Sequence, residues 1–101
     1  MRMLCHVIFP NKEFNAYITD GTVSQKIKRI LDDIKPQAAY FTEYQGKRGV
    51  IIIVDVPEPS AIPKFSEAWF VIFNAEVEWH IVMNPDDLEK AGLEKIAKKI
   101  A

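Results

Sequence analysis

The sequence predicts an α+β domain in which helices cover an antiparallel sheet. Four short segments are rich in β-compatible residues that alternate between two faces. Two longer segments between them repeat apolar residues at helical spacing. A glycine-containing turn joins the second and third strand segments, as in a β-hairpin. The predicted order is therefore strand, helix, strand, strand, helix, strand, followed by a final helix.

The strands are expected at residues 3–9, 37–44, 49–56 and 75–83. The first ends at Pro10, and a turn at residues 45–48 with Gly46 joins the second to the third. The first and third are apolar on both faces, which is typical of central strands covered on two sides. The fourth alternates apolar and polar residues, which indicates the edge of a sheet.

The first helical segment, residues 11–34, is predicted to be two helices near residues 12–19 and 23–34. Its apolar stripes before and after Asp20–Thr22 point in different directions, so the chain should break there. The spacing of residues 22–25 is that of a capping box led by Thr22.

The next helix is expected from Ile62 to Phe73, with Ser60 as its N-cap and Asn74 at its end. A last amphipathic helix follows Asn84-Pro85, and Gly92 can divide it.

Two split strand–helix–strand units with right-handed crossovers make a ferredoxin-like sheet with the strand order four-one-three-two. The two doubly apolar strands then lie in the middle. Two helices cover only one face of such a sheet, and the other face is also largely apolar. We therefore predict a homodimer that packs this face against its own copy. In the alternative, the last helix folds across the bare face and the chain stays monomeric.

Length and charge narrow the function classes. The 101 residues are predicted to form a single domain, 1–101. Thirteen basic and fourteen acidic residues give a net charge of −1 without a basic stripe, which argues against nucleic-acid binding. Cys5 is the only cysteine, so no disulfide or thiolate zinc cluster is expected. Neither a secretory leader nor a membrane-spanning stretch is recognisable, and we predict a cytoplasmic protein without a membrane partner.

Several short segments resemble a family of short bacterial proteins without an established activity. They are Asp20-Gly21-Thr22, Ala39-Tyr40-Phe41-Thr42-Glu43, Gly46-Lys47-Arg48-Gly49, Val54-Asp55, Ile62-Pro63, Phe73-Asn74-Ala75 and Pro85-Asp86-Asp87-Leu88. The resemblance implies membership of the dimeric α+β barrel group, in which two sheets pack face to face. That group includes cofactor-independent monooxygenases, haem-degrading oxygenases, isomerases of small ring compounds and binding modules, so it does not select a chemistry.

The two histidines are the candidates for acid–base chemistry. His80 shares the polar face of the fourth strand with Glu78, and such a pair can act as a general base near neutral pH. The alternative for His80 is an ordinary solvent-facing histidine. His6 lies on an apolar face and is expected in the core, with Cys5 on the opposite face. These residues lack ligand-like spacing, so we expect neither a metal nor a cofactor.

Aromatic and polar residues of the second helix and of strands two to four are candidates for an apolar ligand pocket. The predicted ligand-binding residues are Tyr40, Thr42, Arg48, Trp69, Phe73 and His80. Among them, the Arg48 guanidinium is placed where it can hold a carboxylate. The alternative assigns the aromatic residues to the core and to the dimer interface.

Two function classes follow. In the first, the homodimer binds a small apolar or aromatic molecule, or a protein partner, without catalysis. In the second, it is a cofactor-independent oxygenase or isomerase of a small aromatic or enolisable compound, with His80 as general base. A structural or regulatory role without a ligand is the third alternative.

Overall fold

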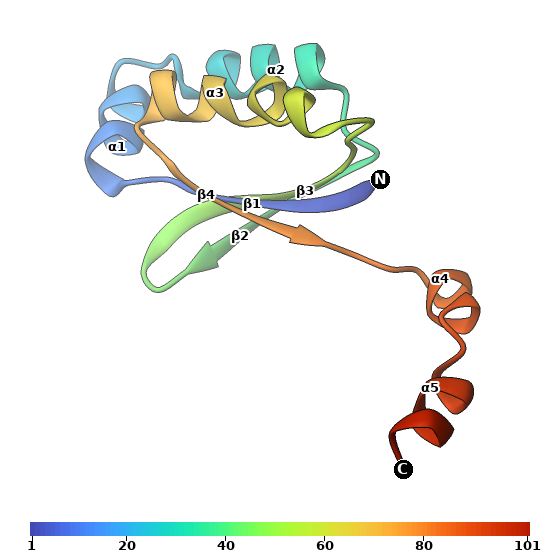
Figure 1. The fold of residues 1–101 in the computed structure, drawn as a ribbon. Helices are drawn as coiled ribbons and strands as arrows, with labels where there is room; N and C mark the ends of the chain where they lie inside the picture. Colours follow the sequence, from blue (N-terminus) through green and yellow to red (C-terminus); the bar gives the residue numbers. More distant parts are fainter.

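The computed structural model describes residues 1–101 and contains one four-stranded antiparallel sheet (Figure 1). The strands are β1 Arg2–Ile8, β2 Ala38–Tyr44, β3 Lys47–Asp55 and β4 Glu76–Ile81. Their spatial order is β2-β3-β1-β4, which places the two doubly apolar strands in the middle as the sequence predicts. The arrangement is α+β and compatible with a ferredoxin-like fold.

Three helices cover one face of the sheet (Figure 1). They are α1 Asn11–Thr19, α2 Val23–Ile34 and α3 Ile62–Phe73, the last preceded by the 3₁₀ turn η1 Pro59–Ala61. Two further helices, α4 Pro85–Lys90 and α5 Leu93–Ile100, follow β4. None of the helices is long and apolar enough to cross a membrane.

The core lies between the sheet and the three covering helices. Cys5 and Val7 of β1 stand opposite Ile52 and Val50 of β3, and all four side chains are fully buried. Above them the rings of Phe9, Trp69 and Phe73 pack together. This aromatic layer fills the space between strand β1 and helix α3, so the interior beneath the helices is closed by side chains.

The predicted break between the first two helices is confirmed, but its chemistry differs from the prediction. Gly21 adopts φ 79°, a left-handed conformation that glycine accepts readily. The capping box is wrong, because the Thr22 side chain makes no capping hydrogen bond. Instead, the Thr22 amide and hydroxyl donate to Asp20 Oδ1 at 3.0 and 2.6 Å. The hydroxyl bond lowers the pKa of the Asp20 carboxyl.

The start of α3 also differs from the prediction. Ser60 lies within the 3₁₀ turn, and Ala61 occupies the N-cap position without a side-chain capping bond. Pro59 starts this 3₁₀ turn. The backbone geometry of the turn, and not a serine side chain, therefore satisfies part of the hydrogen bonding at the start of the helix. The end of α3 at Asn74, in left-handed conformation with φ 54°, is as predicted.

The hairpin turn is shorter than predicted. Only Gln45 and Gly46 lie between β2 and β3, and both have positive φ, 50° and 78°. Two central residues with positive φ are the signature of a two-residue type I′ hairpin. The predicted four-residue turn is therefore wrong, and Lys47 and Arg48 belong to β3. By alternation from Val50, Arg48 lies on the helix side of the sheet.

The face of the sheet turned away from the helices, called the open face below, has no element packed over it (Figure 1). By alternation it carries Leu4, His6, Tyr40, Tyr44, Ile51, Ile53, Glu78 and His80. Its centre is apolar and only half-buried, and Tyr40 is 65% exposed.

Residues 82–101, called the arm below, project from the end of β4 away from the body (Figure 1). Asn84 caps α4 by accepting a 2.8 Å hydrogen bond from the Asp87 amide, and Gly92 with φ 68° separates α4 from α5. The helix start after Asn84-Pro85 and the division at Gly92 match the prediction. The alternative in which the last helix folds across the bare face of its own sheet is not what the structure contains.

Candidate functional site

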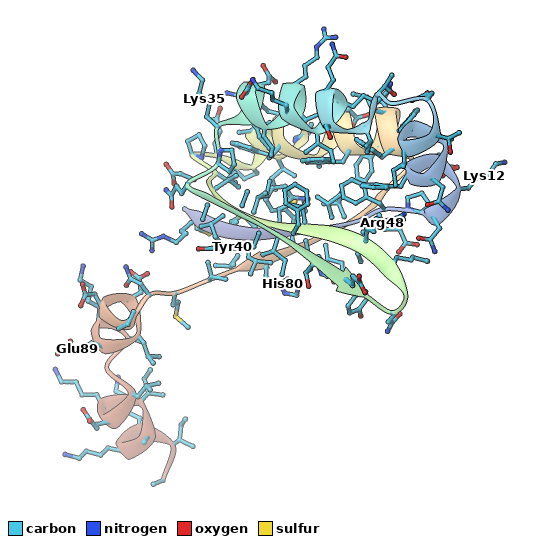
Figure 2. All side chains as sticks on the ribbon, turned by 180° about the vertical axis from the view of Figure 1, so that it is seen from behind. Lys12, Lys35, Tyr40, Arg48, His80 and Glu89 are labelled. Atoms are coloured by element: carbon cyan, nitrogen blue, oxygen red, sulfur yellow. The ribbon has the colours of Figure 1, made fainter.

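The predicted ligand-binding residues do not line one pocket. Tyr40 and His80 are exposed on the open face, whereas Arg48 lies on the helix side (Figure 2). Trp69 and Phe73 are fully buried in the aromatic layer of the core and border none of the larger cavities. Only Thr42 and Arg48 border a common cavity.

That cavity is a groove between α1 and the β2–β3 hairpin, with a volume of about 540 Å³. Its lining residues are Phe9, Phe14, Phe41, Thr42, Glu43, Arg48 and Gly49. The groove is open to solvent, and Phe41 on its wall is 58% exposed. Aromatic walls with a few polar groups are typical of sites for small molecules.

Arg48 is held in place on the wall of this groove. Its Nη1 donates a 2.8 Å hydrogen bond to Asn15 Oδ1 of α1. Its guanidinium carbon lies 4.7 Å from the centre of the Phe14 ring, a cation–π arrangement. Glu43 stands directly opposite Arg48 in the β2–β3 register. One charged donor and one charged acceptor therefore border the same apolar groove.

The second cluster is on the open face, where the structure brings both histidines together with Glu78. His6 stands opposite Glu78 and His80 opposite Leu4 in the β1–β4 register. The polar face predicted for β4 and the apolar face predicted for His6 are thus the same face of one sheet. His80 is exposed, as predicted, and it has no hydrogen bond or ion pair to Glu78.

His6, which the sequence assigned to the core, has the closer carboxylate. Its Nδ1 lies 3.9 Å from Glu78 Oε2, and its ring meets that of Tyr44 edge-on at 5.2 Å. The side chain is 13% exposed, and Nε2 is buried without a hydrogen-bond partner. The pairing of His6 with Glu78 depends on the β1–β4 register, a long-range feature that local alternation does not contain. No group of three or more metal-ligating side chains is assembled anywhere in the chain.

Cys5 lies on the opposite face of β1 from His6, in the core, as predicted. Burial raises the pKa of its thiol from 9.0 to about 12. Since the thiolate is the nucleophile, Cys5 is inert at neutral pH in the folded protein.

We expect Cys5 to resist thiol reagents in the native protein. At pH 8 its reaction with an aromatic disulfide should be at least about a thousandfold slower than in denaturant, because the thiol is reached only through unfolding. Ser24→Cys in a Cys5→Ala background provides an exposed control thiol on α2 and should react fast. Rapid labelling of native Cys5 would contradict its placement.

The raised pKa of Cys5 also affects the stability of the protein at high pH. Because folding raises the pKa of Cys5, the unfolded chain releases the thiol proton first. The contribution of the protonated Cys5 thiol to the free energy of unfolding is therefore present in full below pH 9.0. It is lost as the pH rises toward about 12. Cys5→Ala should remove this part of the pH dependence in urea unfolding.

The chain was compared with models of protein families, with curated proteins and with solved structures, and no match was found in any of the three.

Proposed function

We propose that the chain is a homodimeric binding protein that takes a small aromatic or apolar carboxylate, without catalysing a reaction on it. The ligand lies in the groove between α1 and the β2–β3 hairpin. The observation that carries the proposal is the Arg48 guanidinium, fixed by Asn15 and Phe14 on the wall of a groove of about 540 Å³ that is lined in part by phenylalanines.

The chemistry of the groove supports an anion with an apolar body. A guanidinium has five donors, and the hydrogen bond to Asn15 uses only one of them. The remaining donors can hold a carboxylate. Because the contact with Phe14 already fixes their direction, binding does not cost conformational entropy of the Arg48 side chain. Beside it, the exposed ring of Phe41 offers a face for an apolar or aromatic group.

The open face supports the homodimer in this proposal. Its apolar centre, with Leu4, Ile51 and Ile53, has no cover from the chain itself. By alternation, Phe41, Glu43 and Arg48 of the groove lie on the helix side of the sheet, so a dimer formed through the open face leaves these side chains accessible. The guanidinium of Arg48 and the proposed dimer interface therefore lie on opposite faces of the sheet.

The enzyme alternative, an oxygenase or isomerase with His80 as general base, needs a substrate cavity that His80 borders. The larger cavities have no His80 in their lining, and the space beneath the helices is filled by the aromatic core. Within one chain, Arg48 borders a cavity of the size that a small ligand needs, which supports the binding proposal.

Titration with phenylacetate and benzoate, followed by amide NMR shifts, tests the groove. We expect shifts at residues 14, 41, 42 and 48, and an affinity loss of about ten- to a hundredfold in Arg48→Gln, since hydrogen bonds to charged groups contribute about 1.5–3 kcal/mol. Glu43→Gln should tighten binding, because it removes a like charge beside the carboxylate.

Arg29→Gln, the same change at an exposed position of α2, is the control and should bind like the unmodified protein. Shifts confined to the open face, or equal affinities in Arg48→Gln and Arg29→Gln, would place the ligand elsewhere. Weaker binding in Glu43→Gln would contradict a simple anion as the ligand.

A further inference from the structure

The arm is out of proportion to the rest of the molecule. The radius of gyration is 17.1 Å, whereas a compact chain of this length has about 13 Å. The accessible surface is 7155 Å², about 1,300 Å² more than the roughly 5,800 Å² typical of a compact monomer of this mass. The excess arises because the apolar side chains of α4 and α5 stay exposed and the open face stays bare.

The arm cannot be stable in this form on its own. Helix α4 has six residues and α5 has eight, and isolated helices of that length are marginal in water. Helix α5 is amphipathic, with Leu93, Ile96, Ala97 and Ile100 at positions i, i+3, i+4 and i+7. The large apolar side chains of the arm, Leu88, Leu93, Ile96 and Ile100, are 45–80% exposed. Helices this short and this apolar on one side need a surface to pack against.

The direction of the arm indicates where that surface is. In both views the arm lies on the side of the sheet away from the helices (Figures 1 and 2). This is the side of the open face, which is the other uncovered apolar surface of the chain. The arm and the open face thus point into the same region of space. Within one chain the base of the arm reaches the body through an ion pair, Arg2 Nη1 to Asp87 Oδ2 at 3.7 Å, while the large apolar side chains of the arm stay exposed.

We propose that the arm of each chain docks on the body of a second copy and closes the rim of its open face, in a dimer with reciprocal arm exchange. This inference rests on the homodimer proposed above and adds the arm to its interface. A two-fold dimer places each chain's arm beside the partner's sheet, so both uncovered surfaces are buried by one operation. The net charge of −1 opposes self-association only weakly.

The areas agree with this assembly. An excess of about 1,300 Å² per chain corresponds to about 2,600 Å² in a dimer, within the range of about 2,000–5,000 Å² for obligate homodimers. When the apolar stripe of α5 is docked, Lys95 and Lys98 on the opposite side of the helix remain in water. The C-terminal lysines then keep the outer surface of the arm soluble.

Sedimentation equilibrium combined with amide hydrogen exchange on the full chain tests the arm. We expect a dimer at micromolar concentration, with α5 amides that are protected in the dimer and lose protection on dilution. Ile96→Gln should weaken the dimer at least about tenfold, because it removes a buried aliphatic side chain. Lys95→Gln, the same new residue on the other side of α5, should leave dimerisation within about twofold.

Ile51→Gln, at the centre of the open face, distinguishes the face-to-face dimer from the exchange of arms. It should weaken the dimer and also reduce the protection of α5. A dimer with unprotected α5 and no effect of Ile96→Gln would overturn the arm exchange while leaving the face-to-face dimer. A chain that stays monomeric would overturn both. Protection of α5 in the monomer would show that the arm folds on its own body, which also overturns the inference.

Discussion

Replacing Trp69 by alanine is expected to destabilise the protein by about 3–5 kcal/mol, the usual cost of removing a large buried aromatic side chain. The Trp69 ring is completely buried and lies 5.7 Å from Phe9 and 6.2 Å from Phe73, measured between ring centres. The covering helices are held by their own backbone and cannot collapse fully into the space left behind. A chain of this length has about 5–15 kcal/mol of stability in total, so the loss is a large part of it.

Urea unfolding followed by circular dichroism measures this effect, at one fixed protein concentration because the proposed dimer would couple folding to concentration. Phe70→Ala, the next position on α3, is the control. Its ring is 42% exposed, and its removal should cost no more than about 1 kcal/mol.

Trp69→Phe separates volume from polarity. Trp69 Nε1 is buried without a hydrogen-bond partner, so phenylalanine removes an unsatisfied donor while it keeps most of the ring. We expect this variant to be clearly more stable than Trp69→Ala. If Trp69→Ala and Phe70→Ala have the same midpoint of urea unfolding, the aromatic layer does not hold α3 on the sheet.

Local patterns in the sequence located nearly every element of this fold. The apolar stripe of residues 23–34 and the chain break at Gly21 depend on neighbouring residues only, and both were predicted correctly. The hairpin turn was predicted two residues too long, because Gln45 adopts a positive φ that a glutamine does not indicate in advance. That difference moved Arg48 into β3 and thereby onto the wall of the groove.

The candidate site was harder to predict, because it depends on which strands pair and how. The helical spacing of Trp69 and Phe73 identified an inward face of α3, but spacing alone does not distinguish a filled core from a ligand pocket. The β1–β4 register paired Glu78 with His6, whereas sequence proximity had favoured His80. The arm escaped prediction for the opposite reason: its helices were expected, but the exposure of their apolar side chains is not encoded in their amphipathic pattern.

Among the four glycines, Gly49 is the one whose added methyl group would make the closest contact. A Cβ there would lie 2.7 Å from the Val7 carbonyl oxygen and 3.3 Å from His6 Nε2. The oxygen belongs to the backbone of β1, the central strand that pairs with β3, so it cannot move without disturbing the sheet. The sequence uses glycine here because the two backbones approach too closely for any side chain.

Gly49→Ala should therefore destabilise the protein by about 1–3 kcal/mol, the typical cost of overpacking. The same methyl group would contact His6, so the NMR signals of the His6 ring should shift as well.

Gly21→Ala is the matched control. Nothing lies within 4 Å of its added Cβ, but its φ of +79° imposes a backbone cost of about 1 kcal/mol on alanine. That variant should lose a little stability without changing the His6 signals. If Gly49→Ala unfolds at the same urea concentration as the unmodified protein with His6 unperturbed, strands β1 and β3 separate at this point without cost. In that case the close approach does not constrain the open face, and the position of His6 beside Glu78 is set by other contacts.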